Sequence, residues 1–318
     1  MFYMIFEATN SNELLHYEQL IDFYLKYGSV EAAFYKEREK IFISIASYYR
    51  LIKEWGIVRA VGPHTDFDEK LLFFTLFATA KLPLETFHRL MMLPSFKTSY
   101  NTLIRSFREI RRERTTKEGA ALVITPEGLP DQILVGEETS SRYKYGKKLG
   151  DLSVPMGFSR KDESPYLSIL RLLQMEVSNP LVLEREFVIG SDTSAHIIGE
   201  EQKPFMTIDI ADTRVNVYHL NLPNEHFDPE ILVNHRLRNM QLMTTEEILS
   251  GGLDSSLRTG IPEIVKTYQD VMSSSQDTRN PIESPILVSN LNRQLAQMNL
   301  SHPLWSLNSP IVDSRLND

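Results

Sequence analysis

The sequence has no cysteine in its 318 residues. This absence excludes disulfides, thiolate metal sites and cysteine nucleophiles, and it permits a reducing compartment. Long apolar runs are also missing, because the most apolar stretch, residues 71–80, has about half the length that a membrane span needs. The first residues carry neither the basic start nor the small-residue cleavage site of a signal peptide. We therefore expect a cytoplasmic protein without a membrane segment.

Charge is unevenly spread along the chain. Residues 1–117 contain 17 Lys and Arg against 14 Asp and Glu, and residues 118–318 contain 17 against 28, so the formal charges are +3 and −11. Hydrophobic residues make up 42% and charged residues 24% of the chain, which is ordinary for globular proteins, and the length suits two domains. The asymmetry favours two modules with different partners, of which the basic N-terminal one suits polyanions.

Helical spacing of apolar residues dominates up to about residue 114, and short β-rich runs follow from residue 120. We predict helices at residues 164–177 and 261–272. The predicted strands lie at residues 121–124, 133–135, 187–189, 196–198, 206–210 and 215–220. The pattern indicates an α+β protein with an all-α domain at residues 1–117, a sheet domain at residues 118–272 and a flexible tail or linker at residues 273–318.

The tail is polar and punctuated by prolines. Four apolar residues in it recur at helical spacing and would form a short docking helix: Leu287, Leu291, Leu295 and Met298. The alternative, favoured by the turn-rich flanks, is a solvated coil.

Spaced glycine, glutamate and arginine residues mark one segment of the sheet domain. Glu163 follows Gly157 by six residues, Arg171 follows Glu163 by eight, and Leu173 and Glu176 follow Arg171. This pattern resembles the signature box of the Nudix family, in which Leu173 and Glu176 stand where the family has an apolar residue and a glutamate. The resemblance covers residues 118–272 and implies a Nudix-like α/β/α sandwich. It also implies that Gly157, Glu163 and Arg171 form the scaffold of the box, with Glu163 and Arg171 as structural partners.

The metal-binding carboxylates of the family correspond to Leu172, Met175 and Glu176, of which only Glu176 is acidic. Because these positions stand at i, i+3 and i+4, they share one face of a helix. One carboxylate cannot build the octahedral oxygen shell of Mg2+, so Mg2+ is a candidate cofactor only if other oxygens complete the site, and Glu176 is catalytic only then. The helix is apolar nearly all round, which indicates burial in a larger core or an interface with the N-terminal module or a second subunit.

A basic loop is the candidate ligand site of this domain. It carries four cationic side chains, with Tyr143 and Tyr145 between them: Arg142, Lys144, Lys147 and Lys148. Such side chains would bind phosphates and stack on a base, as a nucleotide-type ligand requires; a solvated hairpin loop is the alternative. The acidic pairs Glu137-Glu138 and Glu200-Glu201 could supply replacement metal oxygens, but exposed loop charge is the favoured expectation.

Residues 28–34 and 43–58 resemble a helix-turn-helix of the transposase and resolvase kind. Ser44 or Ser47 would cap the second helix, and four apolar side chains would seat it: Tyr48, Leu51, Ile52 and Trp55. The outward side chains, which would contact DNA, are Tyr49, Arg50 and Lys53.

A second helix-turn-helix candidate follows at residues 84–92 and 99–112. Its second helix carries Arg105, Arg108, Arg111 and Arg112, and residues 97–117 hold seven Lys or Arg against two Glu. Such a helix would neutralise DNA phosphates whatever the base sequence. The alternative is a linker helix whose arginines pair with the acidic sheet domain.

Three functions are compatible with these patterns. The first is a DNA-binding regulator governed by a non-catalytic Nudix-like domain that senses a nucleotide-type molecule. The second is a Nudix-type hydrolase of nucleoside diphosphate derivatives with an atypical metal site. The third is a non-catalytic protein-interaction scaffold. The expected partners are DNA, a nucleotide-type small molecule and a second copy of the chain in a homodimer, with no membrane.

Overall fold

The computed structural model describes residues 11–60, 117–142, 145–199, 202–250, 256–274, 286–289 and 292–293. Several predictions lie outside these residues, namely the second helix-turn-helix candidate with Arg105, Arg108, Arg111 and Arg112, together with Lys144 and Glu200-Glu201.

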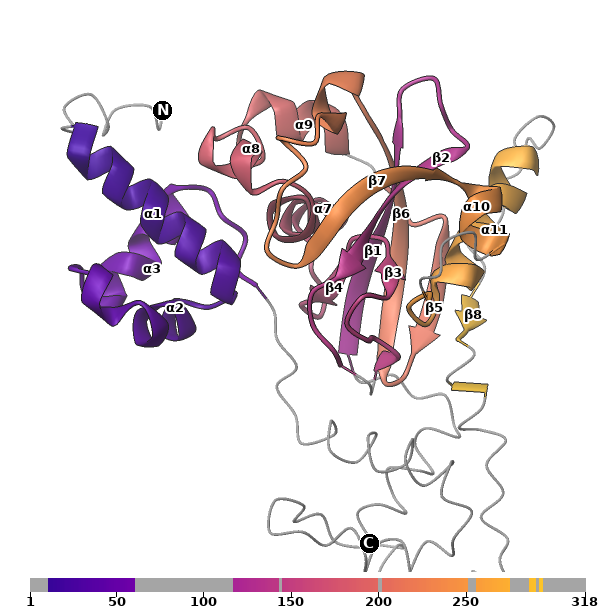
Figure 1. Cartoon of the computed structure of the whole chain (residues 1–318), viewed down its shortest axis with the longest axis horizontal. Helices are drawn as coiled ribbons and strands as arrows, with labels where there is room; N and C mark the ends of the chain where they lie inside the picture. Colours follow the sequence, from indigo (N-terminus) through magenta and orange to yellow (C-terminus); the bar gives the residue numbers. More distant parts are fainter. Residues whose placement is uncertain are drawn as a thin grey trace, which may run out of the picture.

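The described chain forms an N-terminal helical module (residues 11–60) and a mixed sheet domain, so the protein is α+β (Figure 1). The helices and helical turns are α1 (Ser11–Tyr27), α2 (Val30–Lys36), η1 (Arg38–Lys40), α3 (Ile45–Glu54), α7 (Pro165–Leu172), η3 (Leu173–Val177), α8 (Asn179–Leu183), α9 (Asp192–Ile198), η4 (Asn224–Phe227), α10 (Thr245–Ser250) and α11 (Ile261–Ser274). The strands are β1 (Lys117–Pro126), β2 (Gln132–Glu138), β3 (Leu152–Ser153), β4 (Met156–Ser159), β5 (Met206–Ile210), β6 (Thr213–Leu222), β7 (Leu237–Thr244) and β8 (Ile286–Val288).

The strands form two sheets, one in the order β4-β1-β6-β5-β8 and one in the order β3-β2-β7. In the larger sheet β1 runs parallel to β6 and antiparallel to β4. Strand β1 is buried on both faces because its apolar side chains alternate between two cores. Ala120, Leu122 and Ile124 face the core with α7, whereas Ala121 and Val123 face the core with α11. The helices therefore cover both faces of the sheet.

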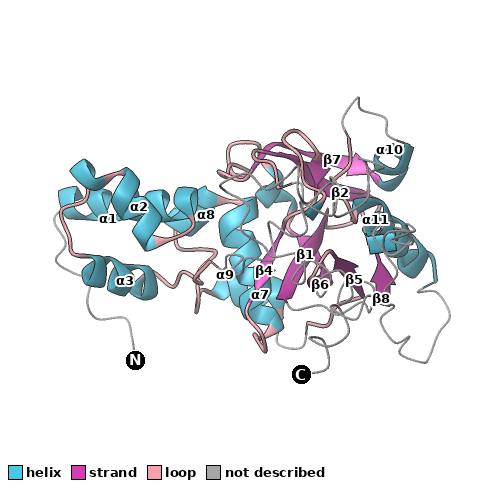
Figure 2. Ribbon diagram, turned by 90° about the horizontal axis from the view of Figure 1, so that it is seen from below, coloured by secondary structure: helices cyan, strands magenta, loops and turns pink. Residues whose placement is uncertain are grey.

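The helical module lies beside α7, α8 and α9, and the sheet separates these helices from α11 (Figure 2). In the module, Ser44 caps α3 by accepting a hydrogen bond from the Ser47 backbone N–H at 3.1 Å. The predicted seat of α3 is buried, and it consists of Tyr48, Leu51, Ile52 and Trp55. The Tyr48 hydroxyl donates to the Leu20 carbonyl, which ties α3 to α1.

Two predictions of local structure are wrong. Residues 187–189 form bends and turns, and residues 196–198 belong to α9. The Ser191 hydroxyl accepts a hydrogen bond from the Ser194 N–H and so caps the N-terminus of α9. This cap favours a helix more than the β-branched residues of the segment favour a strand. In the tail, Leu287 lies in β8, where residues 286–288 pair with β5 in parallel, whereas residues 292–293 are helical and Leu291, Leu295 and Met298 lie outside the described residues.

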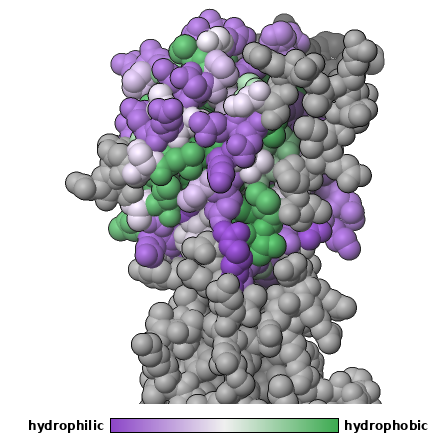
Figure 3. All heavy atoms as spheres, turned by 90° about the vertical axis from the view of Figure 1, so that its right-hand side faces the viewer, coloured by the Kyte–Doolittle hydropathy of each residue, from purple (hydrophilic) through white to green (hydrophobic). Residues whose placement is uncertain are grey.

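The side of the molecule that carries α10, α11 and β8 is mainly hydrophilic, with separate hydrophobic areas among its described atoms (Figure 3). Among the described residues, no helix has the length and apolar character needed to cross a membrane.

Candidate functional site

The loop between β4 and α7 is braced by an ion pair. Glu163 directly precedes Ser164, the N-cap residue of α7. Its carboxylate accepts hydrogen bonds from Arg171, eight residues further along the chain, and from the Ser168 hydroxyl at 2.9 Å. Arg171 also donates to the Phe158 carbonyl at 3.1 Å, so one guanidinium joins the loop, β4 and α7. Both partners are almost fully buried, with side-chain exposures of 5% and 4%. The pair holds the loop in place and leaves no charge free for chemistry.

This brace joins the two spaced residues that the box requires, on a loop and helix that pack against a mixed sheet. The domain is Nudix-like. Gly157 of the box lies in β4, where a Cβ atom would stand 3.2 Å from Leu172 Cδ2 and 3.9 Å from Glu176 Oε1. The missing side chain therefore lets β4 lie close against the helix that carries Leu172 and Glu176.

Comparisons with known proteins give matches among solved structures. The chain is similar to an ADP-ribose pyrophosphatase from Streptococcus suis 89-1591, with 14% identity, coverage of 54% of this chain and 99% of that chain, and a TM-score of 0.33. It is also similar to a MutT protein from Methanosarcina mazei Go1 (11% identity, 52% and 99% coverage, TM-score 0.35) and to a Nudix hydrolase from Nitrosomonas europaea (12%, 55% and 80%, 0.35). No protein-family model and no curated protein matches the sequence. Identities and TM-scores this low say nothing about activity or ligand.

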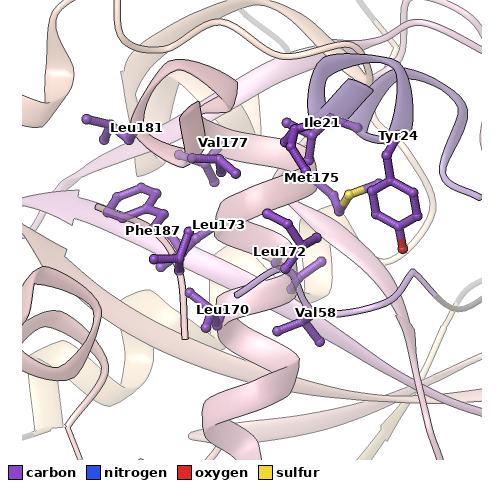
Figure 4. Close-up of a cluster of buried hydrophobic side chains, with 14 of the residues drawn as sticks. Ile21, Tyr24, Val58, Leu170, Leu172, Leu173, Met175, Val177, Leu181 and Phe187 are labelled. Atoms are coloured by element: carbon purple, nitrogen blue, oxygen red, sulfur yellow. The ribbon is translucent and has the colours of Figure 1, made fainter. Parts of the chain in front are cut away.

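The helix face that carries Leu172 and Met175 is covered by the helical module. Leu172 and Met175 are each 2% exposed and belong to the same hydrophobic core as Ile21, Tyr24 and Val58. Figure 4 shows these side chains gathered around the helix formed by α7 and η3. The apolar residues at the carboxylate positions therefore pack against the N-terminal part of the chain, which is the interface alternative of the sequence prediction.

Gln174 joins the two parts through its side chain. Its Oε1 accepts from the Val58 N–H at 2.8 Å, and its Nε2 donates to the Gly56 carbonyl at 3.1 Å and the Phe187 carbonyl at 2.8 Å. Gln174 is fully buried and lies in the π turn η3. Nearby, Trp55 Nε1 donates to the Val182 carbonyl at 3.1 Å. These hydrogen bonds fix the position of the helical module on the Nudix-like domain.

Glu176 is the one family metal ligand that remains, and its surroundings do not fit a magnesium site. Its side chain is 7% exposed, and Oε1 lies 3.3 Å from Nη1 of Arg236. Burial raises the pKa of the Glu176 carboxyl, and the Arg236 guanidinium opposes this shift. No cluster of three or more acidic or histidine side chains suited to a metal ion occurs within the described ranges. A guanidinium occupies the flank of the carboxylate where a cation would bind.

A cavity of about 410 Å³ opens beside Glu176, between the two parts of the chain. The helical module contributes Lys26, Tyr27, Gly28 and Ala60 to its wall. The remaining wall comes from the basic loop, β4, β5, β6, the segment before β7 and Arg258. The lining combines cationic groups with apolar side chains, which suits an organic anion.

The basic loop supplies part of this wall. Arg142 and Lys147 line the cavity, whereas Lys148 is exposed and does not. Tyr145 also lines it, but its ring is buried edge-to-face against Phe158 and its hydroxyl accepts from Lys117 Nζ at 2.9 Å. The loop is therefore partly built into the domain, and Tyr145 is held by the protein.

The prediction that the pair Glu137-Glu138 is exposed is wrong for Glu138, whose side chain is 1% exposed. Lys147 pairs with its carboxylate, and Nη1 of Arg258 lies 2.6 Å from Oε1. Its neighbour Glu137 remains at the surface, with Arg238 Nε at 2.9 Å. The buried ion pairs of Glu138 hold two cations at the cavity wall.

Sequence reasoning missed Arg236 and Arg258. They lie 60 and 82 residues after Glu176, and neither belongs to a motif. Pairing of β7 with β2 brings the segment that carries Arg236 to the cavity, and the bridge between Leu152 and Leu257 brings Arg258. No local sequence pattern gives either placement.

The predicted DNA-contacting side chains of the first helix-turn-helix candidate lie on α3. Arg50 and Lys53 are exposed there. Tyr49 is half-buried, since its hydroxyl donates to Glu31 and the Arg59 guanidinium lies 4.1 Å from the centre of its ring. Only Arg50 and Lys53 thus point freely outward.

Gly28→Ala is expected to cost more stability than Gly128→Ala. Both glycines have positive φ values, +73° and +78°, so each alanine adds left-handed strain of about 1–2 kcal/mol. A Cβ at Gly28 would also stand 2.6 Å from Arg236 Nη2, whereas a Cβ at Gly128 meets nothing within 4 Å. Urea unfolding of both variants measures the difference. Equal losses would show that Arg236 is not held against Gly28.

Proposed function

We propose that the protein is a non-catalytic, cytoplasmic regulator in which the Nudix-like domain binds an anionic, nucleotide-type ligand and the N-terminal part binds DNA. The observation that carries the proposal is the burial of Leu172 and Met175 against the helical module. Carboxylates at these positions would build a metal site; leucine and methionine instead join the ligand-binding domain to its neighbour. The same two residues would then explain both the loss of catalysis and the coupling between the ligand-binding domain and the helical module.

Support for coupling comes from the cavity wall, which includes residues of both parts of the chain. Lys26 and Gly28 come from the end of α1, and Arg236 and His235 come from the Nudix-like domain. His235 Nε2 also lies 2.8 Å from Oδ1 of Asp22 on α1. A ligand in the cavity would contact both parts and change the free energy of their packing.

Support for DNA binding comes from the exposed Arg50 and Lys53 of α3 and from the basic stretch of residues 97–117. Residues 11–60 carry seven Lys or Arg and seven Asp or Glu, so this segment is neutral. Contacts with phosphates then depend mainly on the arginines further along the chain, Arg105, Arg108, Arg111 and Arg112.

Replacing Arg105 and Arg108 together with alanine is expected to weaken duplex DNA binding and to make the negative slope of log K against log[salt] shallower by about 2, roughly one unit for each lost phosphate contact. Fluorescence anisotropy with a labelled duplex at several salt concentrations measures both. Arg238→Ala, on the Nudix-like domain, is the control and keeps the wild-type slope. Affinity that responds neither to salt nor to the double substitution rules out this DNA contact.

A Nudix-type hydrolase of nucleoside diphosphate derivatives is the second candidate, because Glu176 borders the cavity. Nucleotide sugars and dinucleotides incubated with Mg2+ or Mn2+ provide the test. Turnover that Glu176→Gln abolishes would favour this candidate over the regulator. Absence of turnover, of nucleotide binding and of DNA binding would leave the protein-interaction scaffold. A homodimer remains a prediction.

A further inference from the structure

The cavity holds an excess of positive charge in place of a metal ion. Besides Lys26 of the helical module, four cations of the Nudix-like domain line it and face two carboxylates, which leaves an excess of two positive charges within that domain: Arg142, Lys147, Arg236 and Arg258 against Glu138 and Glu176. Glu138 is shared between Lys147 and Arg258, so neither cation has a carboxylate to itself.

Burial and the neighbouring cations both lower the pKa of two of these groups. Burial, and then the Arg236 guanidinium, lower the pKa of Arg142. Burial likewise lowers the pKa of the Lys147 ammonium, and Arg258 lowers it further while Glu138 opposes the shift. Like charges held together in a partly enclosed space are stabilised by an anion between them.

Arg236 takes the position that a cation would have beside Glu176. Its guanidinium is 3.3 Å from Glu176 Oε1 on one side and reaches over Gly28 on the other. The absent side chain of Gly28 makes room for this guanidinium, because a Cβ there would stand 2.6 Å from Arg236 Nη2. A planar guanidinium with several N–H donors can bind Glu176 and a second oxyanion together.

We infer that the cavity binds a phosphate-type oxyanion without a divalent cation, and that Arg236, with Lys147 on the same cavity wall, supplies the positive charge that a metal would supply. The inference rests on the proposed ligand-binding role and adds the ligand chemistry and its independence of metal. Met156, Phe158 and Val215 form an apolar part of the wall, which can receive an organic group attached to the anion.

The test is isothermal titration of the full chain with inorganic pyrophosphate, in EDTA and in excess Mg2+. Binding in EDTA at least as tight as in Mg2+ is the expected result. Binding that requires Mg2+, or no binding in either buffer, overturns the inference. Because the titration contains no DNA, its failure is separate from failure of the DNA-binding proposal, which anisotropy measures independently.

Matched variants locate the anion. Arg236→Gln and Lys147→Met are each expected to weaken pyrophosphate binding at least tenfold. The neighbouring controls Arg238→Gln and Lys148→Met alter cations outside the cavity and keep the wild-type affinity. Equal effects of a variant and its control would mean that pyrophosphate senses only the overall charge, and would overturn the inference.

Glu176→Gln separates this inference from metal-dependent binding, because the two give opposite results. Removal of the negative charge leaves Arg236 to the anion, so pyrophosphate binding is retained or tightened; a loss of binding overturns the inference. Arg236→Gln alone would leave the buried Glu176 without its partner, so the double variant Glu176→Gln with Arg236→Gln guards against misfolding. It keeps the same charge excess and is still expected to lose at least tenfold in affinity, with the wild-type circular dichroism spectrum.

Discussion

Replacing both Leu172 and Met175 with glutamate is expected to lower the free energy of unfolding by about 3 kcal/mol or more, without producing magnesium-dependent hydrolysis. The double substitution restores the family's carboxylates, but each position is 2% exposed and belongs to the core that includes Ile21 and Tyr24. Burial of an ionised carboxylate without a partner is costly, so the helical module is displaced before a metal can bind. Urea unfolding and a hydrolysis assay with Mg2+ measure the two parts of the prediction.

The control exchanges the two apolar residues, Leu172→Met with Met175→Leu, which conserves the total volume and is expected to cost less than about 1.5 kcal/mol for each position. A glutamate variant that keeps wild-type stability and hydrolyses a nucleotide would contradict the prediction. That outcome would mean that the face opens to solvent and that the hydrolase candidate is correct.

Gln174→Leu is expected to lower the free energy of unfolding by about 2–4 kcal/mol, although leucine matches the apolar surroundings. The substitution leaves the Val58 N–H and the Phe187 carbonyl buried without this partner. The Gly56 carbonyl keeps a second hydrogen bond, from the Ile189 N–H at 3.0 Å, so its loss costs less. Chemical denaturation gives the magnitude, and faster amide exchange at Val58 identifies the cause.

Gln241→Leu serves as the control, because Gln241 is exposed on β7 and its amide contacts only the Met243 sulfur among the described hydrogen-bonding partners. Its expected change lies within about 0.5 kcal/mol. If Gln174→Leu costs no more than this control, the hydrogen bonds of Gln174 do not hold the two parts together.

The sequence predicted the features that depend on residues close together in the chain. The β-rich run at residues 121–124 predicts β1 because strands of this kind are buried on both faces. The cap at Ser44 and the seat of α3 follow from spacing within one helix. The fixed interval from Glu163 to Arg171 places both side chains on the same loop and helix, so the ion pair is also local.

Interactions between distant segments could not be read in the same way. The acidic pair at 137–138 suggests a surface loop, yet β2 carries Glu138 inward to Lys147 and to Arg258, 120 residues away. Arg236 reaches Glu176 only because β7 pairs with β2. In residues 187–198 the apolar residues suggest strands, but the Ser191 cap and packing against neighbouring helices decide the structure. The sequence therefore indicated which types of residue line the cavity, but it did not indicate how they are arranged.

Trp55, Val58, Leu172 and Phe187 belong to one hydrophobic core, so we expect the helical module and the Nudix-like domain to unfold together. If either part were removed, the apolar surface that it covers on the other part would be exposed to water. A partner that pulls on the helical module therefore acts on the free energy of the cavity, and a molecule bound in the cavity acts equally on the module. This reciprocal effect would follow from the packing of the helix formed by α7 and η3 against the helical module, and it would require no moving lid.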